Sequence, residues 1–156
     1  MVWLWTAIEG DWGDEAMLNN QAELNHSLST FFLMWLALRA YLELLRVDLR
    51  LARGGFPLVY DKVRTSPVRC NRHHARVAED ICHAVDLACV FYFKDVRCLQ
   101  RSAAATTLLR DSSFPAEMVI GVEPFPFRAH AWVELAGHIV NDKPYTSEMY
   151  TVMDRC

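Results

Sequence analysis

The spacing of apolar residues along the chain changes after residue 115. Before that point apolar residues recur every three or four positions, which is the spacing of one helix face. After it, short apolar segments alternate with polar positions and turn residues, which favours strands. Helices followed by an antiparallel meander predict an α+β fold, in which N-terminal helices pack on a small antiparallel sheet.

The first predicted helix covers residues 16–53 and carries a long apolar row. Two glycines and a proline at 54–57 are expected to end it, with a connecting loop over 54–68. Arg39 and Glu43 leave the uncharged run too short for a membrane span. We expect the row to pack in the core, with docking of a partner protein as the alternative; its members are Leu28, Phe31, Phe32, Trp35, Leu38, Leu42, Leu45 and Leu49.

Two shorter helices and three strands complete the predicted elements. The helices are expected over 73–91 and 98–110, and the strands over 116–123, 130–135 and 138–142. The second helix has an apolar stripe that we expect to be buried, formed by Val77, Ile81, Ala84, Val85 and Ala88.

Composition narrows the class of protein. The 156 residues are 53% hydrophobic and 22% charged, which supplies a core and gives no sign of disorder. We divide the chain into an N-terminal helical region, 1–66, and a core, 67–156. A net charge of −3 without a basic, aromatic-rich stretch argues against nucleic-acid binding. Five irregularly spaced cysteines suggest no disulfide framework, and the first residues lack a basic signal region, so we expect a cytoplasmic location.

Cys98 is a candidate nucleophile because of its place at the start of the third predicted helix. The helix dipole and the neighbouring Arg97 favour the thiolate there. The free N–H groups of the first turn could also bind a developing oxyanion. Cys82 and Cys89 lie in mid-helix and have neither advantage. The alternative for a single cysteine is a small buried hydrophobic residue.

A predicted hairpin lies between His130 and Asp142. A three-residue loop over 135–137, with Gly137 in the left-handed conformation, would place these two residues directly opposite each other. A two-residue loop would require a positive φ at Ala136 and would turn Asp142 to the other face. We therefore expect a His130–Asp142 pair in which the carboxylate orients the imidazole.

These segments resemble a known family. The stretch CLQRS at 98–102, followed by MVIGVEPFPFRAHAWVELAGHIVND at 118–142, is similar to the bacterial lasso peptide leader peptidases, the transglutaminase-like part of the lasso peptide biosynthesis B protein. The resemblance implies a transglutaminase/papain-like core and cleavage of a ribosomally made precursor at its leader–core junction. It also implies that Cys98 is the nucleophile, His130 the general base and Asp142 the orienting acid, acting through a thioester.

The resemblance further implies partners. A small leader-binding protein would deliver the precursor peptide, and an ATP-dependent macrolactam synthetase would close the ring. The chain has little room for a leader-binding domain of its own, so it looks like the split form, and no cofactor is expected. Two other functions stay open: a transglutaminase or amidase that passes the acyl group to an amine, and a non-catalytic module that binds the precursor.

Three further residues are candidate substrate contacts: Arg101, Trp132 and Glu134. Surface ion pairing is the alternative for Arg101 and Glu134, and packing beneath the site is the alternative for Trp132. We expect no metal site. One cluster of cysteines and histidines has a spacing that fits no compact zinc ligand set, which favours core thiols and solvated helix residues; its members are Cys70, His73, His74, Cys82, His83 and Cys89.

Overall fold

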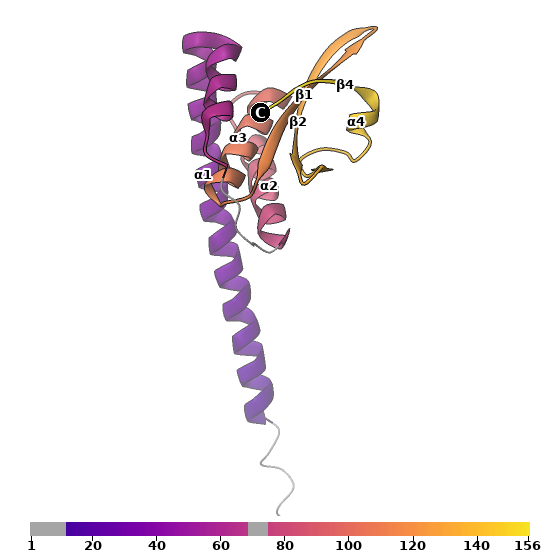
Figure 1. Ribbon diagram of the computed structural model, residues 1–156. Helices are drawn as coiled ribbons and strands as arrows, with labels where there is room; N and C mark the ends of the chain where they lie inside the picture. Colours follow the sequence, from indigo (N-terminus) through magenta and orange to yellow (C-terminus); the bar gives the residue numbers. More distant parts are fainter. Residues whose placement is uncertain (1–11, 69–74) are drawn as a thin grey trace, which may run out of the picture. The chain divides into compact units, whose positions relative to one another are not determined.

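A computed structural model describes residues 12–68 and 75–156, with side chains described for residues 30–68 and 76–156. The chain divides into two compact units, Met1–Trp35 and Leu36–Cys156, and the fold below is that of the second. The elements are α1 (Trp12–Thr65), α2 (Ala75–Val90), α3 (Cys98–Asp111), β1 (Ala116–Pro124), β2 (Phe127–Leu135), β3 (His138–Ile139), α4 (Thr146–Met149) and β4 (Thr151–Arg155) (Figure 1).

Helix α1 continues through the segment where we expected a loop. At Gly55 the backbone has φ 66° and ψ −157°, which kinks the helix. Glycine adopts this conformation without a steric penalty. Pro57 follows in the first turn of the second arm, where a missing N–H breaks no helical hydrogen bond. The prediction of a loop over 54–68 is therefore wrong for most of its length.

Helix α1 buries a different face from the one we expected. Leu36, Ala40, Leu44 and Val47 are buried. All members of the predicted apolar row whose burial is described are exposed. The buried residues and the predicted row both recur at helical spacing. The small Ala40 side chain permits close packing of the buried face. The prediction that the row packs in the core is wrong for Phe31, Phe32, Trp35, Leu38, Leu42, Leu45 and Leu49.

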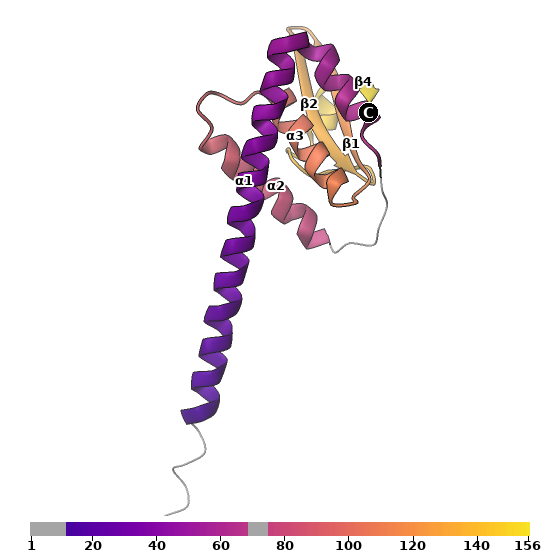
Figure 2. The same ribbon diagram turned by 90° about the vertical axis from the view of Figure 1, so that its left-hand side faces the viewer.

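The four strands form one antiparallel sheet in the order β3-β2-β1-β4. The order of the meander β1-β2-β3 was predicted, but β3 ends at Ile139, so the prediction of a strand over 138–142 is wrong for 140–142. Strand β4 adds to the free edge of β1 and was not predicted. Figure 2 shows α3 beside β1 and β2, which it also contacts. The expected α+β fold, with helices packed on a small antiparallel sheet, is confirmed.

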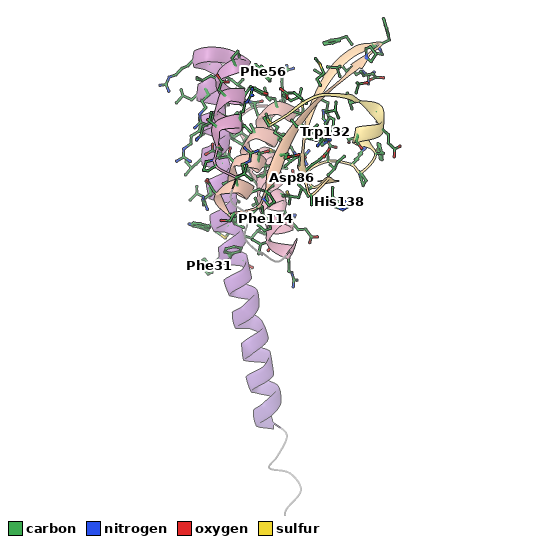
Figure 3. The ribbon with its side chains drawn as sticks, viewed as in Figure 1. Phe31, Phe56, Asp86, Phe114, Trp132 and His138 are labelled. Atoms are coloured by element: carbon green, nitrogen blue, oxygen red, sulfur yellow. The ribbon has the colours of Figure 1, made fainter. Side chains whose placement is uncertain are left out.

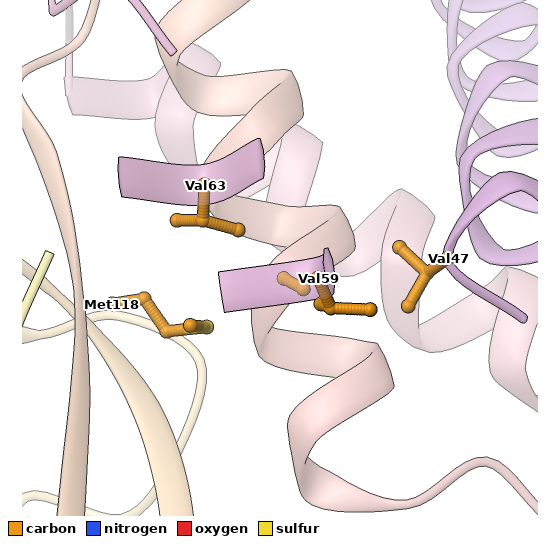
Figure 4. Close-up of a cluster of buried hydrophobic side chains, with 5 residues drawn as sticks. Val47, Val59, Val63 and Met118 are labelled. Carbon is orange, nitrogen blue, oxygen red and sulfur yellow. The ribbon is translucent and has the colours of Figure 1, made fainter. Parts of the chain in front are cut away.

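A compact core joins the helices to the sheet. Val47 and Val59 come from the two arms of α1, and Met118 comes from β1 (Figure 4). The buried Arg110 of α3 donates to the carbonyl oxygens of Val63 (2.5 Å) and Ala116 (2.7 Å), which ties α1, α3 and β1 together. Of the five predicted core residues of α2, Val77 is half-buried. The other four are buried: Ile81, Ala84, Val85 and Ala88.

Within the described residues, no helix is both long enough and apolar enough to span a membrane.

Candidate functional site

Cys98 is the first residue of α3, as predicted, and its side chain is half-buried. Arg97 is the N-cap, with an extended backbone at φ −88° and ψ 163°. The first hydrogen bond of the helix runs from Arg101 N–H to Arg97 O at 3.1 Å. The N–H groups of Cys98 and Leu99 precede that bond and have no acceptor within the helix. Cys98 thus lies at the positive end of the helix dipole.

Gln100 and Asp48 hold the start of α3 in place. Gln100 Oε1 accepts from Arg97 N–H at 2.9 Å, and its Nε2 donates to Asp48 on α1. Asp48 also accepts from Tyr92 Oη at 2.6 Å and pairs with Lys94 Nζ at 2.9 Å. Burial works to raise the pKa of Asp48, but hydrogen bonds from Tyr92, Lys94 and Gln100 lower it below its ordinary value. The ionised carboxylate of Asp48 on α1 therefore connects the turn that follows α2 to the start of α3.

The other described cysteines lie in less reactive surroundings. Burial raises the pKa of Cys82 to about 11, and it also raises the pKa of Cys89 and of Cys156. These three thiols are protonated at neutral pH, and none of them begins a helix. Among the described cysteines, Cys98 alone begins a helix; Cys70 lies outside the described residues.

His130 and Asp142 form a direct pair. His130 Nε2 lies 2.6 Å from Asp142 Oδ2. Burial works to raise the pKa of Asp142, but the His130 hydrogen bond, the Lys143 N–H and the nearby Arg101 charge lower it below its ordinary value. An ionised carboxylate accepts only, so the neutral imidazole donates from Nε2. Its Nδ1 is then available to receive a proton from another group.

The pair forms by a different route from the predicted one. Leu135 pairs with His138, so the hairpin loop is Ala136–Gly137 alone. The two loop residues have φ 49° and 81°, as in the tight turns whose twist matches that of paired strands. The predicted three-residue loop and its register are therefore wrong. The pairing of β2 with β3 ends at Ile139. Asp142 is therefore not held in the register of the sheet, and its carboxylate reaches His130.

An aromatic cluster packs against the imidazole. The His130 ring stacks on Tyr150 with 5.1 Å between centroids and on Trp132 with 6.2 Å. Gly121 lies opposite His130 in the sheet. A Cβ atom at Gly121 would lie 2.7 Å from the Trp132 ring and 2.8 Å from Tyr150 Cβ, so this position must be glycine for the cluster to form. Tyr150 had no sequence signal, since it lies twenty residues beyond His130.

Two of the candidate substrate contacts have structural roles. Trp132 is fully buried among the strands (Figure 3), and its Nε1 donates to Glu134 Oε1 at 2.8 Å. Glu134 is 4% exposed and accepts from Arg155 Nη1 at 2.5 Å. Substrate contact at either would require the cluster to open. Arg101 is partly exposed, and its Nε donates to Asp86 Oδ1 of α2 at 2.7 Å.

No group of three or more metal-ligating side chains capable of holding an ion occurs in the part of the chain that the structure describes. Cys82, His83 and Cys89 of the cysteine and histidine cluster lie on α2. The other three members, Cys70, His73 and His74, lie outside the described residues.

Comparison with known proteins identifies the superfamily of the chain. Residues 41–155 match the Transglutaminase-like superfamily. The chain belongs to this superfamily. The matched segment includes Cys98, His130 and Asp142, and the transglutaminase-like core expected from the sequence is confirmed.

One curated protein is similar over part of its length. The microcin J25-processing protein McjB of Escherichia coli is 38% identical over 56 residues, which are 36% of this chain and 27% of McjB. The aligned part of the chain thus spans about a quarter of that relative. No solved structure matches the chain.

Proposed function

We propose that this transglutaminase-like protein is a cysteine endopeptidase that removes the leader from a ribosomally synthesised lasso precursor peptide. Cys98 is the nucleophile, His130 the general base and Asp142 the orienting acid. The observation that carries the proposal is the 2.6 Å pair between His130 and Asp142. The similarity to McjB, a microcin J25-processing protein, supports a precursor peptide as the substrate.

The packing of α3 on β2 supports a reaction between Cys98 and His130. Ser102 lies four residues after Cys98 and so on the same helix face. Its Oγ donates to the carbonyl oxygen of Ala131, the residue next to His130, at 2.8 Å. The face of α3 that carries Cys98 therefore follows β2 in the region of the imidazole.

The reaction then proceeds in two halves. His130 Nδ1 takes the thiol proton as Cys98 Sγ attacks the scissile carbonyl carbon, and the amides of the first turn of α3 stabilise the oxyanion. The C–N bond breaks, the imidazolium gives its proton to the amine of the core peptide, and the leader remains as a thioester. Water, deprotonated by His130, hydrolyses the thioester and restores the thiol. Asp142 stabilises the imidazolium in both halves.

Partners follow from the same proposal. A small leader-binding protein presents the precursor to the peptidase, and an ATP-dependent macrolactam synthetase closes the ring on the released core. The test is therefore mass spectrometry of a precursor peptide incubated with this chain and a leader-binding protein. Wild type, Cys98→Ala and the matched control Cys89→Ala are compared.

Two products whose masses sum to the precursor plus one water, formed by wild type and Cys89→Ala alone, are expected. Cleavage that survives Cys98→Ala would refute Cys98 as the nucleophile. An intact precursor in all samples, with binding confirmed, would instead indicate a module that only binds the precursor.

Membership of the transglutaminase-like superfamily favours one second candidate, transfer of the acyl group to an amine. The same experiment with an added primary amine distinguishes the transferase from the peptidase. A leader product carrying the amine in place of water identifies a transferase, and a free carboxylate identifies a peptidase.

A further inference from the structure

Behind the His130–Asp142 pair, a buried polar network connects three segments. Asn141 Nδ2 donates to Ser102 Oγ at 3.0 Å, and Ser102 Oγ donates to Ala131 O at 2.8 Å. Asn141 Oδ1 accepts from Val133 N–H at 2.7 Å. These directions are the consistent ones, because a backbone N–H only donates and a carbonyl oxygen only accepts. Ser102 is 1% exposed and Asn141 is 6% exposed.

The network ends the β2–β3 ladder. Val140 N–H donates to Val133 O at 3.0 Å, and in a regular antiparallel pair Val133 N–H would donate back to Val140 O. It donates to the Asn141 side chain instead. A regular continuation of the ladder would turn Asp142 to the face opposite to His130. The departure that Asn141 stabilises is therefore what allows Asp142 to meet the imidazole.

We propose that Asn141 and Ser102 are positioning residues that hold Asp142 against His130 and align it with the helix that carries Cys98. The inference rests on the proposed peptidase function. Ser102 belongs to α3, one turn after Cys98, and Asn141 directly precedes Asp142. One buried hydrogen bond thus couples the nucleophile helix to the loop that carries the acid. Neither side chain touches the reacting atoms, and both act through the residues they hold.

The test compares Asn141→Ala and Ser102→Ala with the matched control Thr107→Val. Thr107 is a buried hydroxyl residue of the same helix, but its Oγ1 donates only within α3, to Ala103 O at 2.8 Å. The first readout is the NMR signature of the His130 imidazole nitrogens in the protein alone, which reports the hydrogen bond to Asp142 without any substrate. The second is steady-state cleavage of the precursor peptide, resolved into kcat and KM.

We expect wild type and Thr107→Val to show the hydrogen-bonded Nε2–H signature. Asn141→Ala and Ser102→Ala should weaken or lose it, with kcat lower by on the order of 100-fold and KM nearly unchanged, because the catalytic groups are misplaced while peptide binding is kept. Ser102→Ala removes a single hydroxyl and keeps α3 intact, so it serves if Asn141→Ala does not fold.

An unchanged imidazole signature in a folded Ser102→Ala variant would overturn the proposal. An equal loss in Thr107→Val would overturn it too, since any buried hydroxyl of α3 would then have the same effect. If wild type cleaves no peptide, the proposed function fails, and the imidazole signature still decides whether Asn141 and Ser102 position the pair.

Discussion

At the residue scale, the proposed function makes the charge of Asp142 more important than its ability to accept a hydrogen bond. In Asp142→Asn an amide oxygen can still accept from His130 Nε2, so the ring orientation is kept. The negative charge that we propose stabilises the imidazolium is lost. We expect kcat for precursor cleavage to fall by on the order of 100-fold in steady-state measurements.

The control for that prediction is Asp111→Asn. Asp111 ends α3 and forms an exposed ion pair with Arg39 at 3.4 Å, so the substitution removes the same charge far along the helix from Cys98. Activity should stay at the wild-type level. Full activity in Asp142→Asn, or an equal loss in the control, would show that the carboxylate does not assist the imidazole.

Gly121 allows a second prediction at this scale. In Gly121→Ala the new methyl group would overlap the Trp132 ring and Tyr150 Cβ. Overpacking of this kind costs about 1–3 kcal/mol, so the free energy of unfolding should fall by that amount in urea denaturation. The near-UV circular dichroism should change as the cluster shifts. An unchanged urea midpoint with an unchanged spectrum would mean that the cluster is looser than described.

Single residues also show how far the sequence could predict the site. Cys98 at a helix start was predictable, because local patterns mark helix starts. The His130–Asp142 pair was also expected, but from a hairpin register that the structure does not have, so the hairpin pattern does not explain the pair. The two-residue loop at Ala136 was not predictable, because alanine disfavours a positive φ, whereas the twist of a two-residue turn requires one there. Gln100 finds its partner Asp48 52 positions away, and no local pattern reports such a contact.

At the element scale, two adjacent leucines of α1 separate its buried and exposed faces. Leu44 is 1% exposed, whereas Leu45 is 37% exposed. Leu44→Ala should lower the free energy of unfolding by about 2–5 kcal/mol, because it leaves a cavity. Leu45→Ala should change it by less than about 1 kcal/mol. Urea denaturation of both variants measures the difference, and equal losses would contradict the assignment of the buried face.

The same helix shows why the sequence predicted the element but not its orientation. Apolar residues occupy two faces of α1 at helical spacing, so periodicity predicts a helix and leaves its buried side open. The choice depends on the surfaces of α3 and β1 that pack against it. Strand β4 was missed for a related reason: all five of its residues are exposed, so it has no alternating pattern, and its partner is the edge of β1.

At the scale of the whole molecule, the described contacts of the site all lie within the unit Leu36–Cys156. The superfamily match also begins after this boundary, at residue 41. We therefore expect a chain shortened to residues 36–156 to keep the far-UV circular dichroism of a folded α+β domain and the imidazole signature of His130. A shortened chain that lacks cooperative thermal unfolding would show that residues 1–35 are needed for the fold.

Acid stability tests how three buried or half-buried carboxylates contribute to the stability of the whole fold. The pKa values of Asp48, Glu134 and Asp142 are all lowered in the folded protein, although burial opposes the shift, because hydrogen bonds and nearby cations favour the charged forms. The unfolded chain then binds more protons, so their stabilisation is complete above about pH 4, the ordinary carboxyl value, and is lost as the pH falls through the lower folded values.

The free energy of unfolding, measured in urea from about pH 6 to about pH 3, should therefore decrease towards acid. Asp48→Asn removes one of the three carboxyl groups, and with it the charge that holds Tyr92, Lys94 and Gln100. This variant should be less stable at neutral pH and should lose less stability on acidification. The free energies of unfolding of wild type and Asp48→Asn should converge at low pH, where Asp48 is protonated in both the folded and the unfolded wild type. Parallel curves would mean that the Asp48 charge makes no contribution, and that the start of α3 is held by packing alone.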